Sequence, residues 1–161
     1  MSLTPASSWP IRFCLLYLAA LLSVALAAKA QTPTVAGVQV SGVGLAKTVR
    51  INPAELAKLP RRQVARPDHG GKPRTYSGVA LYDVLTAVGA ELGSKLPGKG
   101  MAHYLLASAA DGYHAVFALA ELDPGFATHT IVLADRCDGQ PRPATAGPYQ
   151  IIVPDEKKMG R

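Results

Sequence analysis

Two apolar segments, residues 103–109 and 113–117, restrict the fold most, because they flank the turn residues Asp111-Gly112. Short apolar runs around an Asp-Gly pair are typical of a β-hairpin. We expect one face of this hairpin to carry Leu105, Ala107 and Val116, and the other to carry Tyr104, Leu106, Ala115 and Phe117. Strands that are apolar on both faces are usually covered by other layers on both sides. The hairpin is therefore predicted to lie inside a layered domain.

Further short strands are predicted along the chain. The pattern places them at residues 38–40, 47–51, 130–134 and 149–153, with a strand fragment and a loop over residues 61–74. The strands are interrupted by turn residues rather than joined by long helices. No internal repeat accompanies them.

Three short helices are expected. Asn52 followed by Pro53 is typical of a helix start, and Pro60 ends this helix. Apolar residues recur at helical spacing over residues 79–88, with Gly89 as the C-cap, and residues 118–122 form a helical turn. The sequence thus predicts a single α+β domain of mixed, strand-rich sheets with a few short helices.

Residues 1–30 are typical of a secretory signal peptide. Arg12 precedes an apolar run from Phe13 to Ala28, and Ala28-Lys29-Ala30 matches a cleavage site. The run is shorter than the roughly 20 residues that cross a bilayer. We expect a mature domain of residues 31–161, periplasmic or secreted, with no membrane contact after cleavage. An uncleaved N-terminal anchor is the alternative.

Only one of the two cysteines, Cys137, follows the predicted cleavage site. An internal disulfide is therefore excluded from the mature domain, and its stability must come from burial. Cys137 precedes the turn signal Asp138-Gly139 and is expected to lie in a loop.

Sequence motifs assign no catalytic and no metal-ligating residue. The four histidines stand apart, and none lies two or four positions from another. No serine lies in the G-x-S-x-G context of a hydrolase, and the glycines do not match the nucleotide-binding patterns.

Charge is unevenly distributed along the chain. Residues 47–74 hold eight Lys or Arg against two acids, whereas residues 111–138 hold five acids against one Arg. Such runs are most often solvated surface. The alternative is an anion site, where four arginines offer bidentate contacts: Arg61, Arg62, Arg66 and Arg74. Nucleic acid is not expected as a partner, because no aromatic residues are interleaved with these charges.

A series of blocks resembles the oxidoreductase molybdopterin-binding domain of the sulfite oxidase fold. The blocks are the aromatic-x-G-V-x-L-x-D-x-L segment at residues 76–85, Asp111-Gly112-Tyr113, the aliphatic strand at 131–134, Asp138-Gly139-Gln140-Pro141, and Gly147-Pro148-Tyr149 leading into Val153-Pro154. The similarity spans about residues 45–161.

The resemblance implies a domain that binds a molybdenum-molybdopterin cofactor. It implies that Lys158, Gly160 and Arg161, in the basic stretch after the last strand, help to hold the pterin. It also implies that the metal's cysteine ligand comes from residues 61–75, where this chain has none. Relatives continue with a further strand, so the sequence is either a fragment or a member trimmed at its C-terminus.

Three functional hypotheses remain at this point. The first is an exported molybdopterin-domain-like protein that takes part in redox chemistry with a partner protein and, if an enzyme, is an oxidoreductase. The second is a non-catalytic module that keeps the fold without the cofactor and binds an anionic small ligand or a protein. The third is a metal or redox protein based on Cys137.

Overall fold

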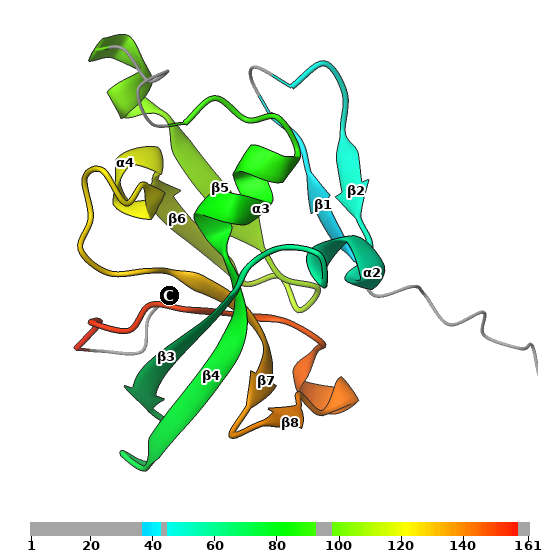
Figure 1. Cartoon of the computed structure of the whole chain (residues 1–161), viewed down its shortest axis with the longest axis vertical. Helices are drawn as coiled ribbons and strands as arrows, with labels where there is room; N and C mark the ends of the chain where they lie inside the picture. The colour runs from blue at the N-terminus through cyan, green and yellow to red at the C-terminus, as the bar shows by residue number, and fades with distance from the viewer. Residues whose placement is uncertain (1–36, 43–44, 93–97, 158–161) are drawn as a thin grey trace, which may run out of the picture. The chain divides into compact units, whose positions relative to one another are not determined.

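The computed structural model describes residues 37–42, 45–92 and 98–157, which fall within one compact unit (Figure 1). The predicted signal peptide and the predicted cofactor residues Lys158, Gly160 and Arg161 lie outside these residues. Among the residues described, no helix is long and apolar enough to cross a membrane. The unit is a small α+β domain, rich in short strands and with a few short helices, as expected.

The largest sheet has five antiparallel strands. They are β3 (Arg61–Pro67), β4 (Pro73–Ala80), β7 (Val132–Cys137), β8 (Gln140–Pro141) and β9 (Gln150–Ile152). Their order is β3-β4-β7-β8, and β9 pairs with β7. The pairing of β3 with β4 runs from Arg61 opposite Val79 to Pro67 opposite Pro73. The loop expected around residues 67–71 is the tip of this hairpin, and the strand fragment expected before it is a full strand, β3.

The helix predicted over residues 79–88 begins two residues later than expected. Val79 and Ala80 end β4, and α3 spans Leu81–Ala87. Pairing with β7 holds these two residues in the strand, because Val79 lies opposite Leu133. Gly89 follows the helix with φ of 86°, as expected for a glycine C-cap.

The Asp138-Gly139 pair forms a two-residue turn between β7 and β8. Both residues have positive φ, 49° and 79°, and Cys137 lies opposite Gln140. This is the backbone conformation that Asp-Gly favours in tight hairpins. The prediction of a loop position for Cys137 was wrong, because the hairpin extends β7 as far as this residue.

A second, two-stranded sheet pairs β1 (Val38–Val40) with β2 (Val49–Ile51). It leads into α2 (Pro53–Leu56), whose Asn52 cap is confirmed. The Glu55 amide donates to Asn52 Oδ1 at 3.0 Å, and the Asn52 amide donates to Glu55 Oε2 at 2.8 Å. This reciprocal pair satisfies amides that a one-turn helix otherwise leaves without partners.

The central hairpin is confirmed as β5 (Tyr104–Ser108) and β6 (His114–Ala118). Its predicted faces were wrong in two ways. Leu106 lies opposite Val116, and Leu105 lies opposite Phe117, so the two strands combine differently from the prediction. The face with Leu106 and Val116 is also uncovered among the described residues, since each is 52% exposed.

The main core lies beneath the covered face of this hairpin and around α3. Phe117 is fully buried there, packed in one cluster with Val84, Leu85 and Leu133. Leu122 of α4 (Leu119–Leu122) belongs to this core, and the remaining short helices are η3 (Gly98–Ala102) and η4 (Ala144–Ala146). A smaller cluster of Tyr76, Val132, Ala134 and Ile152 lies within the five-stranded sheet. Val64 of β3 packs against this cluster, and Arg66 lies two residues further along the same strand.

Candidate anion site

Arg66 is the buried cation of the described residues, with only 6% of its surface exposed. Strand alternation puts it on the same face of β3 as Val64, and Val64 lies opposite the buried Tyr76. None of the side-chain hydrogen bonds and ion pairs between described residues involves Arg66, and its nitrogens are not among the fully buried atoms that lack a partner. A buried charge is costly unless it is paired. Arg66 is therefore a site where an external anion would be stabilising.

Arg74 lies directly opposite Arg66 on β4, but it is neutralised within the protein. Its Nη1 donates to Asp138 Oδ2 at 2.6 Å, and its Nε donates to Asp68 Oδ2 at 3.2 Å. The Thr75 amide and Arg74 lower the pKa of Asp138, and the Lys72 amide and Arg74 lower that of Asp68. Both carboxylates are thus committed to Arg74 and to nearby amides rather than to Arg66.

The tip between β3 and β4 is ordered by Asp68. Its Oδ1 accepts hydrogen bonds from the amides of Gly70 at 2.9 Å and Lys72 at 3.0 Å. Gly71 has φ of 78°, a conformation that favours glycine. This loop holds His69 next to the end of β3.

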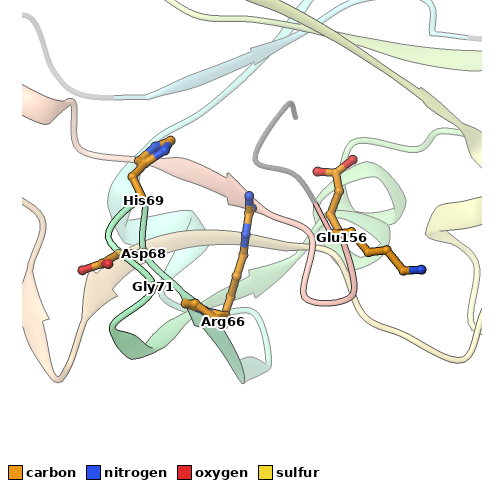
Figure 2. A pocket seen from close by; sticks show the side chains of 7 residues that line it. Arg66, Asp68, His69, Gly71 and Glu156 are labelled. Atoms are coloured by element: carbon orange, nitrogen blue, oxygen red, sulfur yellow. The ribbon is translucent and has the colours of Figure 1, made fainter.

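A pocket of about 450 Å³ lies between this tip and the segment after β9. Its lining includes Arg66, His69, Glu156 and Lys157. Figure 2 shows Arg66, His69 and Glu156 extending toward the same side, whereas Asp68, which also lines the pocket, extends in another direction. The pocket is an open depression of the surface rather than an enclosed cavity. The arrangement can bind an oxyanion, because a guanidinium offers two parallel donors to such a group.

Two other arginines of the predicted anion site, Arg61 and Arg62, differ from Arg66 in their pairing or their exposure. Arg61 makes a bidentate ion pair with Asp135, and this pairing lowers the pKa of that carboxyl. Arg62 is exposed on β3. Of the four arginines predicted for an anion site within residues 47–74, we therefore keep Arg66 as the candidate.

A second pocket, of about 280 Å³, lies beside the Arg61–Asp135 pair and is lined by Tyr149 and Arg142 among others. Here the charged groups already have partners. Arg142 donates to Gln150 Oε1 and to the carbonyl oxygen of Ala146, and Asp135 accepts from Arg61. We therefore place the candidate site in the larger pocket.

Over the described ranges, no group of three or more His, Cys, Asp or Glu side chains is arranged to hold a metal ion. Cys137 is half-buried at the end of β7, opposite Tyr76. Burial and the nearby Cys137 raise the pKa of the Tyr76 phenol. His129 is 3.5 Å from Asp155, away from the other three histidines in the sequence.

Sequence reasoning found part of this site. Arg66 was among the four candidate arginines, but Glu156 was not considered, and His69 was treated as an isolated loop residue. Alternation along β3 puts Arg62, Val64 and Arg66 on one face, so it separates Arg66 from Arg61 but not from Arg62. No sequence signal relates Glu156 to β3, because the two are brought together only by the fold.

Comparison with protein-family models finds none that matches the chain, and a search of the curated proteins finds no match either.

Proposed function

We propose that the domain is an exported ligand-binding module that takes an anionic small ligand in the Arg66 pocket. One observation carries the proposal: Arg66 is buried and lines the pocket, yet it has no ionic partner among the described residues. Lys157 and His69 line the same pocket and add further donors. An anion would replace the water that Arg66 loses on burial.

The charge of the neighbouring arginine supports this proposal. Two cations directly opposite each other on paired strands destabilise the pair. Asp68 and Asp138 compensate Arg74, so within the described part of the chain Arg66 is the cation of this opposed pair that has no carboxylate partner. A bound oxyanion would complete the pairing with a bidentate contact.

Calorimetric titration with inorganic phosphate tests the proposal on protein exported from the full chain. The informative variant is Arg66→Met, which keeps an apolar side chain of similar length but removes the charge. Arg62→Met is the matched control, since Arg62 is exposed on the same strand. We expect saturable binding by the wild type and Arg62→Met, and at least about tenfold weaker binding by Arg66→Met. No binding by the wild type, or equal binding by Arg66→Met, would contradict the proposal.

A molybdenum-molybdopterin cofactor is the second candidate, and one observation favours it. Lys157 lines the pocket and directly precedes Lys158 in the stretch expected to hold a pterin. The described residues do not fit the metal itself. Residues 61–75 contain no cysteine, and the pocket presents a guanidinium and no cysteine thiolate. The anionic phosphate of such a cofactor fits Arg66 and Lys157 better than its metal does.

Metal analysis, combined with fluorescence of the oxidised pterin, separates the two candidates. The protein is purified after export in its native host, so that any cofactor is loaded there. Stoichiometric molybdenum and pterin would contradict the proposed ligand-binding module. They would support the alternative, a cofactor-binding protein that acts with a redox partner. Phosphate binding without molybdenum or pterin is the outcome that the proposed module predicts.

A further inference from the structure

His69 lines the pocket of the proposed anion site together with Arg66, and both side chains extend toward the same side (Figure 2). None of the side-chain hydrogen bonds and ion pairs between described residues involves His69. Histidine is the side chain that ordinarily changes its charge between about pH 5 and about pH 8. Among the residues that line the pocket, His69 is therefore the one whose charge can follow the pH near neutrality.

Hydrogen bonds within the tip fix the backbone on both sides of His69. The Asp68 amide donates to the carbonyl oxygen of Lys72 at 2.9 Å, and the Gly71 amide donates to the carbonyl oxygen of Asp68 at 2.8 Å. Oδ1 of Asp68 also accepts from the amides of Gly70 and Lys72. Because the backbone is already fixed, placing the imidazole against a ligand costs side-chain entropy only.

We infer that an oxyanion binding at Arg66 takes up a proton at His69, so that the site binds anions more tightly as the pH falls from about 8 to about 6. This inference rests on the proposed anion-binding function and names the regulation of the same site. A dianion favours the protonated imidazole, which is positively charged and donates from both ring nitrogens. The linkage is reciprocal: an anion that favours the proton is favoured by the proton to the same extent.

Four other charged residues line the pocket with His69. They are Arg66 on β3, Asp68 in the tip, and Glu156 and Lys157 after β9. Arg and Lys side chains are ordinarily protonated, and Asp and Glu side chains ordinarily ionised, between about pH 6 and about pH 8. The two carboxylates favour the protonated imidazole and the two cations oppose it. A bound dianion offsets the cations and thus shifts the balance toward protonation.

The test is calorimetric titration with sulfate at about pH 6 and about pH 8, at constant ionic strength, on protein produced from the full chain. Sulfate is the probe because, unlike phosphate, it stays a dianion over this range, so that a change in affinity comes from the protein. We expect the wild type to bind sulfate about two- to fivefold more tightly at the lower pH, since His69 is exposed and solvent screens its charge. We expect His69→Asn, which keeps a polar side chain but takes up no proton, to bind equally at both pH values.

His129→Asn is the matched control. His129 pairs with Asp155, which directly precedes Glu156, but it is not among the residues that line the pocket. We expect this variant to keep the wild-type pH dependence. Titrations at about pH 6.5 in two buffers of different ionisation enthalpy measure the proton directly. They should show uptake by the wild type and by His129→Asn, and none by His69→Asn.

Three outcomes would overturn the inference and leave the anion site itself standing. They are equal affinities of the wild type at the two pH values, a pH dependence that persists in His69→Asn, and a dependence that is lost in His129→Asn alone. If sulfate binds at neither pH, the inference also fails. The phosphate titration of the wild type, Arg66→Met and Arg62→Met then decides separately whether the proposed function fails with it.

Discussion

Arg66 and Arg74 lie directly opposite each other on β3 and β4, but among the described residues only Arg74 has carboxylate partners. Arg74 is held between Asp68 and Asp138, which belong to two different turns. Arg66 is the more buried of the two and faces a pocket instead. Among the described residues, one cation of the pair is thus neutralised internally, and the other has no carboxylate partner.

Without ligand, Arg66 should lower the stability of the fold. Replacing a buried charge by an apolar residue of similar size is often stabilising. We therefore expect Arg66→Met to raise the free energy of unfolding of the ligand-free protein by about 1–3 kcal/mol. Arg62→Met, at an exposed position of β3, should change it by less than about 0.5 kcal/mol. Urea unfolding in phosphate-free buffer measures both, and a large destabilisation by Arg66→Met would show that Arg66 is satisfied within the protein.

Low pH should weaken the ion pairs that Arg74 makes with Asp68 and Asp138. Asp68 and Asp138 have pKa values below the ordinary carboxyl value, so the unfolded chain binds protons at higher pH than the folded one does. Their stabilisation is complete above about pH 4 and is lost as the pH falls through the lowered values. Arg74→Met removes one cause of each shift but keeps the amide contacts of both aspartates.

We predict that the unfolding free energy of Arg74→Met falls less steeply below about pH 4 than that of the wild type. Urea unfolding at a series of pH values measures the two slopes, with Arg62→Met as the charge-matched control. Parallel curves for Arg74→Met and the wild type would mean that Arg74 does not set the pKa of these carboxyls.

Gly78 permits the close contact between β4 and β7. A Cβ atom there would lie 2.0 Å from the carbonyl oxygen of Leu133 and 2.6 Å from the Cα of Ala134. Both are backbone atoms, so the strands themselves would have to move. We expect Gly78→Ala to cost at least about 3 kcal/mol or to prevent folding. Gly98→Ala, with no atom within 4 Å of its Cβ position, is the control and should be nearly neutral in thermal unfolding.

The two faces of the β5–β6 hairpin should respond differently to substitution. Phe117 is fully buried, and Phe117→Ala is expected to cost about 3–5 kcal/mol. Leu106 is 52% exposed on the other face, and Leu106→Thr should change stability by less than about 0.5 kcal/mol. Denaturant unfolding distinguishes the two. A cost for Leu106→Thr close to that of Phe117→Ala would mean that the outer face is covered in solution.

Local signals in the sequence predicted most of the elements of this domain. The Asn52-Pro53 helix start, the C-cap at Gly89 and the hairpin around Asp111-Gly112 depend on neighbouring residues, and all three are present. Val79 and Ala80 were predicted to be helical. This prediction was wrong because their strand conformation depends on pairing with β7, which is distant in the sequence. Both faces of the β5–β6 hairpin were predicted to be covered, but the face with Leu106 and Val116 is exposed. Apolar alternation does not reveal whether another layer covers a strand.

The candidate site was less predictable than the elements. Arg66 could be proposed from its charge, but its burial follows from its register in β3. Glu156 follows β9, far from β3 in the sequence, and reaches the pocket through the tertiary fold. The predicted residues Lys158, Gly160 and Arg161 came from a family resemblance and stay a prediction, because they lie outside the described part of the chain.

The most direct test of the central claim is to locate a bound oxyanion by anomalous diffraction. Crystals of the protein, grown without phosphate or sulfate, would be soaked in arsenate, which resembles hydrogen phosphate in shape and in carrying a hydroxyl. We predict an arsenic peak in the pocket, within hydrogen-bonding distance of the Arg66 guanidinium and on the side to which Glu156 extends. A pocket without arsenic, with Arg66 paired to a carboxylate of the protein, would contradict the account.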